Sequence, residues 1–270
     1  MGVLFLASSG ASEPIDYADL ALRYDLSRRA EPAIVAALVA GLSNPHTRRV
    51  LEIGAGTGNY LLELALRGFR MVGLEWSAAM IERGRQKVKR DWILADALAI
   101  PLRDRSIDSA VGVNVLHHLK DAEGVFRELR RVVNDGLVVQ AVVRENLETL
   151  WYRHYFPEID TVLLPLHMSL GATVTSMLRA GFKRVVTKPI FYSGSSDLTF
   201  ESARRTPALL FDSNFRDSTS GFRRLSRRCV EAGLRALARD MESGDLSRIA
   251  SLYENAHQLV GDCMILRVWA

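Results

Sequence analysis

Short apolar runs alternate with longer mixed segments through the middle of the chain. Residues 50–53, 71–74, 92–95, 109–116 and 137–143 are rich in Val, Leu and Ile, so we expect buried strands there. Between these runs, apolar residues recur every three to four positions, which predicts amphipathic helices. Alternating strands and helices favour an α/β fold with a parallel-rich sheet covered on both faces.

A glycine-rich turn follows the first of these strands. The sequence reads Glu52-x-Gly54-x-Gly56-x-Gly58, and helix-forming residues then run to Gly68. Glycine can take a positive φ and lets backbone N–H groups approach a ligand closely. Strand, glycine turn and helix are the layout of a nucleotide or cofactor site, although a plain tight turn would need similar glycines.

Carboxylates end the next two predicted strands, where Glu75 follows residues 71–74 and Asp96 follows residues 92–95. A carboxylate one strand and one helix beyond the glycines can accept hydrogen bonds from both hydroxyls of a ribose. The carboxylate of Asp96 can accept a hydrogen bond from an exocyclic amino group, such as that of adenine. Because parallel strands end at one edge of a sheet, we expect the three features to meet there.

Two cofactor classes compete for this edge. A dinucleotide fingerprint, G-x-G-x-x-G, would place its third glycine at position 59, which is Asn59. The observed spacing instead resembles the first motif of class I S-adenosylmethionine-dependent methyltransferases. Residues 73–77, 95–102 and 107–119 resemble the acidic second motif, the adenine-binding third motif and the fourth-strand motif of that family. The resemblance is to its small-molecule (type 11) branch, which includes ubiquinone and menaquinone biosynthesis methyltransferases, and covers about residues 15–190 and the final strand.

The resemblance implies a Rossmann-like, doubly wound, mostly parallel seven-stranded sheet whose last strand, Cys263–Trp269, is antiparallel. It also implies that an N-terminal segment closes over the amino-acid end of S-adenosylmethionine. The cofactor-binding residues that follow from the matched motifs are Tyr24, Arg28, Glu52, Gly54, Ala55, Gly56, Gly58, Glu75, Trp76, Met80, Asp96, Ala97, Leu98 and Asn114.

Three regions are expected along the chain. Residues 1–45 would form the N-terminal helical segment, residues 46–190 and 260–270 the core, and residues 191–259 a helical cap over the substrate side. A dimerisation surface, giving a homodimer, is the alternative role for the insertion. Its apolar residues from Phe222 to Met241 predict one long helix. Arg223, Arg224, Arg227 and Arg228 would lie on that helix, and we favour a solvated face over a surface for an acidic partner.

The acceptor side is less well defined by the sequence. The candidate catalytic bases are His117, His118 and His154, although histidines after the fourth strand are frequent in this family without proton transfer. Aromatic residues beyond the fifth strand are expected to line a substrate pocket, with core packing as the alternative. The predicted pocket residues are Tyr17, His118, Trp151, Tyr152 and Tyr155.

Composition sets the remaining bounds. The 270 residues are 48% hydrophobic with a formal charge of +4, enough for one substantial core. Cys229 and Cys263 fit no metal spacing, so no metal site is expected. The N-terminus lacks the pattern of a signal peptide, and no window approaches about 20 apolar residues, so a soluble cytoplasmic protein without a membrane span is expected.

The expected reaction is in-line methyl transfer from S-adenosylmethionine to a small molecule. An Asp/Asn-Pro-Pro-aromatic motif, which nucleic-acid amino methyltransferases carry, is missing after the fourth strand, where the residues are Asn114-Val115-Leu116-His117. Neither cysteine follows a proline, as cytosine C5 methyltransferases require. The alternatives are a nicotinamide-dependent oxidoreductase, a non-catalytic donor-binding protein and an RNA-associated methyltransferase.

Overall fold

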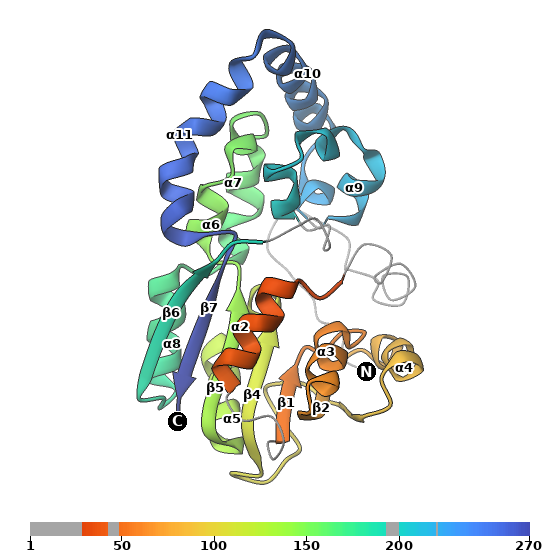
Figure 1. Ribbon diagram of the computed structural model, residues 1–270, viewed down its shortest axis with the longest axis vertical. Helices are drawn as coiled ribbons and strands as arrows, with labels where there is room; N and C mark the ends of the chain where they lie inside the picture. Colours follow the sequence, from red (N-terminus) through yellow and green to blue (C-terminus); the bar gives the residue numbers. More distant parts are fainter. Residues whose placement is uncertain (1–28, 43–48, 193–199, 220) are drawn as a thin grey trace.

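The computed structural model describes residues 29–42, 49–192, 200–219 and 221–270. Within these residues a seven-stranded sheet has the order β3-β2-β1-β4-β5-β7-β6 (Figure 1). Strands β1 to β5 pair in parallel, and β7 is antiparallel to both of its neighbours. This confirms the predicted sheet. The strands are β1 (Arg49–Ile53), β2 (Arg70–Glu75), β3 (Asp91–Leu94), β4 (Ile107–Val113), β5 (Val133–Ala141), β6 (Arg184–Ile190) and β7 (Cys263–Trp269).

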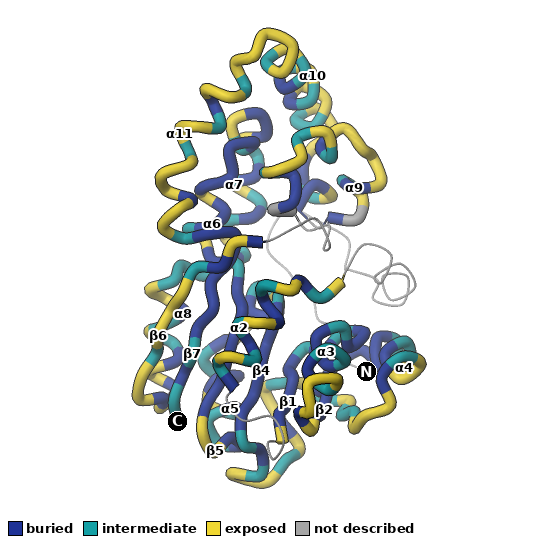
Figure 2. The backbone as a smooth tube through the Cα atoms, viewed as in Figure 1, coloured by how far each residue is buried: buried dark blue, intermediate teal, exposed yellow. Residues whose placement is uncertain are grey.

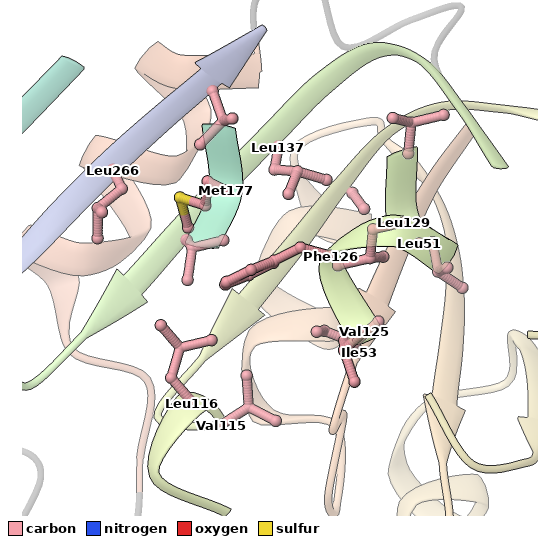
Figure 3. Close-up of a cluster of buried hydrophobic side chains, with 14 of the residues drawn as sticks. Leu51, Ile53, Val115, Leu116, Val125, Phe126, Leu129, Leu137, Met177 and Leu266 are labelled. Carbon is pink, nitrogen blue, oxygen red and sulfur yellow. The ribbon is translucent and has the colours of Figure 1, made fainter. Parts of the chain in front are cut away.

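Helices cover both faces of the sheet. One face carries α2 (Pro32–Leu42), α3 (Asn59–Leu66) and α4 (Ala78–Lys87), and the other carries α5 (Ala122–Val132) and α8 (Leu170–Arg179). Fully buried Phe126 of α5 lies at the centre of the second face, among side chains of β1, β5, β7 and α8 (Figure 3). The apolar periodicity of α5 therefore marks its core face, as the sequence predicted.

Strand β5 begins earlier than expected. Residues 134–136, which read as a turn, lie inside the strand, and the pairing with β4 shifts between Ile107 and Ser109. Gly136 has a φ of 149°, and a Cβ added there would lie 1.9 Å from the carbonyl oxygen of Val268. The predicted turn was wrong because this glycine serves the close approach of β7 rather than a chain reversal.

Short helices from two stretches of chain build a second layer beyond the carboxyl ends of the parallel strands (Figure 1). Both stretches share one buried aromatic and aliphatic cluster, and exposed residues cover its outside (Figure 2). We call this layer the cap. Its first stretch comprises α6 (Arg144–Glu148), η3 (Trp151–His154), α7 (Glu158–Val162) and η4 (Leu164–Leu166). Its second comprises η5 (Phe200–Arg204), η6 (Pro207–Phe211), α9 (Ser213–Ser218), η7 (Phe222–Arg224), α10 (Arg227–Ser243) and α11 (Asp245–Val260).

The long helix predicted from Phe222 is interrupted. The side chain of Ser226 accepts a hydrogen bond from the backbone N–H of Cys229 and caps α10, which begins at Arg227. Phe222–Arg224 forms a separate 3₁₀ turn, η7. The arginines expected on one helix are thus divided between two elements, and Arg224 takes a direction independent of α10.

A buried carboxylate ties the cap to the sheet. Asp262, just before β7, accepts a hydrogen bond from the Tyr192 backbone N–H at 2.7 Å and pairs with Arg205. Its second oxygen lies 3.1 Å from Nε2 of His257 in α11. Burial acts to raise the pKa of Asp262, but these hydrogen bonds and the Arg205 charge outweigh it and lower the pKa.

The stretch Glu158–Arg179 is long and apolar enough to cross a membrane by length and composition, which the sequence analysis did not anticipate. In the fold this stretch is not one helix, because it divides into α7, η4 and α8, with Pro165 inside η4. A membrane-spanning helix must satisfy its backbone hydrogen bonds continuously, so this arrangement does not support a span.

Candidate cofactor and acceptor site

The glycine turn after β1 leaves one glycine facing open space. Gly54, Gly56 and Gly58 all have positive φ, at 61°, 54° and 79°. A Cβ added at Gly54 would meet Val115 at 2.5 Å, whereas a Cβ at Gly56 would meet no atom within 4 Å. The turn therefore presents its backbone at Gly56 to a ligand, and it packs against the protein at Gly54.

Helix α4 and strand β3 support this turn from below. The indole of Trp92 fills the space where Cβ atoms at Gly58, Gly73 and Gly84 would lie, at 3.0, 2.9 and 2.6 Å. The Nζ of Lys87 donates hydrogen bonds to Thr57 Oγ1 at 3.0 Å and to Asn59 Oδ1 at 2.6 Å. Sequence analysis missed Trp92 and Lys87, because their contacts depend on how α4 packs.

Replacing Gly84 with Ala tests the support by Trp92. Alanine is the better helix former, but its Cβ would clash with an indole that is already confined by two other glycines. Overpacking of roughly 1–3 kcal/mol should exceed the propensity gain of up to about 1 kcal/mol, so we expect a net loss of about 1 kcal/mol in the free energy of unfolding. Urea denaturation measures it. Gly171→Ala in α8, where no atom lies within 4 Å, is the control; a Gly84→Ala variant as stable as that control would contradict the packing role.

The carboxylate of Glu75 joins the end of β2 to the glycine turn. Its Oε2 accepts a hydrogen bond from the Gly56 N–H at 2.9 Å, and its Oε1 accepts those of Trp76 and Ser77 at 3.0 Å each. Burial raises the pKa of Glu75, and the three backbone hydrogen bonds oppose that rise. The structure thus brings together two of the features that the sequence predicted at this edge.

A second buried acid lies below the turn. Glu52 in β1 is 3% exposed, and burial, with the nearby charge of Glu75, raises the pKa of Glu52 to about 8. Its Oε2 has no hydrogen-bond partner among the described residues. An unsatisfied buried carboxyl group is destabilising, so its presence indicates a function.

The end of β4 holds an unusual backbone conformation. Asn114 has a φ of 50°, and its N–H donates a hydrogen bond to Oε1 of Gln140 in β5 at 2.9 Å. Gln140 is fully buried, and its Nε2 has no partner within the described part of the chain. Gln140 was not predicted, because a polar residue inside an apolar strand run gave no sign of its partner.

The third strand end contributes an open, apolar surface. Asp96 is exposed, and its Oδ1 accepts the Leu98 N–H at 2.9 Å. Trp76 is 47% exposed and Leu98 is 43% exposed. Of the other predicted cofactor residues, Ala97 is half-buried, and Ala55 and Met80 are buried. Tyr17, Tyr24 and Arg28 lie outside the described residues.

Three histidines gather beyond the end of β4. The ring centroids of His117 and His118 in η2 (Leu116–His118) are 4.0 Å apart, and His117 stacks on His167 at 5.0 Å and 19°. Nδ1 of His167 lies 3.0 Å from the carbonyl oxygen of Leu163; a carbonyl only accepts, so Nδ1–H donates. Sequence analysis placed His117 and His118 here but left His167, on the chain after η4, out of the predicted site.

His118 is accessible to solvent and yet surrounded by protein, which identifies it as the wall of a recess. These surroundings lower the pKa of His118 to about 4, and the positive charges of His167 and Arg224 act in the same direction. His118 is therefore neutral near pH 7. Predicted candidate His154 is exposed, packs edge-on against Tyr155 and has no described contact with this cluster.

Replacing Arg224 with Gln should raise the pKa of His118, because one of the two positive charges that disfavour its protonation is removed. Ring-proton NMR titration of the histidines measures the change. Arg223→Gln, on the exposed neighbouring residue, should leave the pKa of His118 where it is. An equal titration in the Arg224 variant and the wild type would show that the guanidinium does not face the ring.

The predicted pocket aromatics lie inside the cap. Trp151, Tyr152 and Tyr155 are 2%, 0% and 5% exposed. The Trp151 Nε1–H donates to the Arg204 carbonyl oxygen at 3.0 Å, and the Tyr155 hydroxyl donates to Asp240 at 2.8 Å. This burial favours core packing over a pocket wall. Trp151 also borders a cavity of about 460 Å³ between α11 and the end of β6, on the side of His257.

Comparison with known proteins bears on this arrangement. Residues 51–139 match a family described as a methyltransferase domain. A demethylmenaquinone methyltransferase of Roseiflexus castenholzii is 33% identical over 132 residues, which cover 46% of this chain and 56% of that protein. A malonyl-[acyl-carrier protein] O-methyltransferase of Legionella pneumophila is 38% identical over 93 residues, covering 32% of this chain and 33% of that protein. The chain spans about half the length of the Roseiflexus relatives that it matches.

Solved structures share the whole architecture, including the cap. A protein of Anabaena variabilis, assigned to methyl transfer in an antibiotic biosynthesis pathway, superposes with a TM-score of 0.76 and 27% identity. The match covers 89% of this chain and 98% of that one. A [4+2]-cyclase superposes with a TM-score of 0.52 over 87% of this chain at 18% identity, a likeness of fold alone.

Proposed function

The chain belongs to the class I S-adenosylmethionine-dependent methyltransferases, and we propose that it transfers a methyl group from S-adenosylmethionine to a small-molecule acceptor. One observation carries the proposal: the Glu75 carboxylate at the end of β2 is hydrogen-bonded to the open glycine turn after β1. The exposed apolar surfaces of Trp76 and Leu98 flank Asp96 at the end of β3, beside this pair.

The residues present fit the donor. Glu75 has two carboxylate oxygens with about four acceptor positions, of which backbone N–H groups use three, and it would accept hydrogen bonds from ribose hydroxyls. Asp96 would accept one from the adenine amino group, with Trp76 and Leu98 against the base. The unsatisfied Oε2 of Glu52 suits the ammonium group of the donor's amino-acid end.

When bound, S-adenosylmethionine supplies a methyl group on a sulfonium, which is already a good leaving group. The chain's own residues then need chiefly to align and to exclude water, and positioning alone can contribute roughly 7–11 kcal/mol. The strand ends fix the donor side, and the cap covers the carboxyl edge of the sheet. His118 is neutral near pH 7, so it can accept a proton from a hydroxyl or amine acceptor.

A nicotinamide cofactor is the competing proposal, and Asn59 speaks against it. In dinucleotide-binding sites a glycine at this position lets the helix pack closely on the strand. Here the Asn59 side chain instead holds Lys87 of α4. Calorimetry with S-adenosylhomocysteine and with NADH tests the choice: we expect micromolar binding of the first only. Binding of NADH alone would overturn the proposal.

A non-catalytic donor-binding protein and an RNA-associated methyltransferase need a second readout. Incubation with methyl-labelled S-adenosylmethionine and a cell extract should label a small molecule. Donor binding without any labelled product would favour the binding protein, and label in RNA would favour the RNA-associated enzyme. Relatives named for demethylmenaquinone and for malonyl-[acyl-carrier protein] support a small or carrier-bound acceptor.

We further propose the cytoplasmic location and the three-part division that the sequence predicted, with one change. The cap would comprise residues 144–166 in addition to residues 200–260, because the two stretches share one buried cluster. The homodimer stays a prediction, which sedimentation would test.

A further inference from the structure

One half-buried arginine of the cap lacks the partner that its neighbours have. Arg224 makes no side-chain hydrogen bond or ion pair to any described residue. The other half-buried arginines in the described part of the cap are held by acceptors: Arg153 by Asp160, Arg204 by Glu254 and Arg216 by the carbonyl oxygen of Leu210. A partly buried guanidinium normally has such an acceptor, because it carries five donors.

The position of Arg224 is fixed by the cap core. Its neighbour Phe222 packs against the rings of Phe156 at 5.2 Å and of Tyr152 and Phe215 at 6.4 Å each. The carboxylate of Glu158 is engaged by the N–H and hydroxyl of Ser226 at 2.6 Å, two residues further on. That acid is therefore occupied, and it leaves Arg224 uncompensated.

Arg224 faces the histidine recess, where its charge acts on His118. His118 and His167 meet through His117, and no acidic side chain contributes to the electrostatics of His118. A neutral His118 offers one N–H donor to a ligand. The recess thus combines one uncompensated positive charge with a neutral donor at the cap side of the proposed methyl-transfer site.

We propose that Arg224 and His118 bind an anionic oxygen group of the acceptor, the carboxylate or phenolate of a small organic acid. A planar guanidinium matches a carboxylate with two parallel N–H···O bonds, and it pairs with a phenolate through one. The inference rests on the proposed function, because it assigns the acceptor side of that site.

The test uses the full chain and three probes: benzoate, its neutral counterpart benzamide, and 4-nitrophenolate at pH 8. Binding is followed by the ring NMR signals of the six histidines. We expect a saturable shift of the His118 signal with benzoate, with 4-nitrophenolate or with both, and none with benzamide. Benzoate alone indicates a carboxylate acceptor, and 4-nitrophenolate alone indicates a phenolate.

Arg224→Gln should raise the dissociation constant of the anionic probe about tenfold or more, the scale of a charge-assisted hydrogen bond. Arg223→Gln, exposed on the same turn, is the matched control and should bind as the wild type does. Equal binding of benzamide, no binding of either anion, or unchanged affinity in Arg224→Gln would overturn the inference. S-adenosylhomocysteine calorimetry on the same samples separates the two levels: donor binding without anion binding removes this inference only.

Discussion

Replacing Glu75 with Ala should weaken binding of S-adenosylhomocysteine by roughly 1.5–3 kcal/mol, about ten- to hundredfold in dissociation constant. The carboxylate is the proposed ribose acceptor, and it also holds the Gly56 N–H at 2.9 Å. Its loss therefore removes a ligand contact and frees the turn that presents the backbone. Calorimetry measures the affinity, and circular dichroism establishes that the variant is folded.

Asp91→Ala is the matched control for Glu75, because Asp91 is an exposed acid at the opposite end of the neighbouring strand β3. It should bind S-adenosylhomocysteine as the wild type does. An unchanged affinity in a folded Glu75→Ala variant would remove Glu75 from the site.

Replacing Glu52 with Gln should stabilise the protein at alkaline pH. The pKa of Glu52 is about 8 in the folded chain and near 4.5 in the unfolded one. Between these values the unfolded state ionises and the folded state does not, so wild-type stability falls as pH rises, by about 1.4 kcal/mol per pH unit. Glutamine does not titrate, so the advantage of the variant should grow from pH 5 to pH 8, to on the order of 4 kcal/mol.

Urea denaturation of both proteins at pH 5 and pH 8 measures this difference. The same variant should bind S-adenosylhomocysteine more weakly, because an amide cannot supply the negative charge that an ammonium group would pair with. A stability difference independent of pH would show that Glu52 is ionised in the folded protein. Gain of stability with loss of binding is the pattern expected where a site keeps a destabilising group for function.

The sheet was predictable because its strands are short, continuously apolar and separated by turn residues. Strands β1, β2 and β3 lie at or within one residue of their predicted runs, and the antiparallel placement of β7 came from family resemblance. The predicted turn at residues 134–136 failed because Gly136 is needed by contact with β7, which lies over 130 residues away in sequence. Local patterns do not encode such a long-range contact.

The cofactor edge was visible in sequence because Gly56, Glu75 and Asp96 each follow a strand. Trp92, Lys87 and Gln140 were not, since their roles depend on the packing of α4 and β5. The cap was the least predictable region. Its short helices are buried on several sides, so they show no clean period, and only the Ser226 cap separates Arg224 from α10.

A crystal structure of the protein with S-adenosylhomocysteine tests the central claim most directly. We expect the ribose hydroxyls within hydrogen-bond distance of the Glu75 carboxylate, the adenine between Trp76 and Leu98, and the backbone at Gly56 against the ligand. A ligand bound elsewhere, with the Glu75 carboxylate still engaged only by its three backbone N–H groups, would contradict the claim.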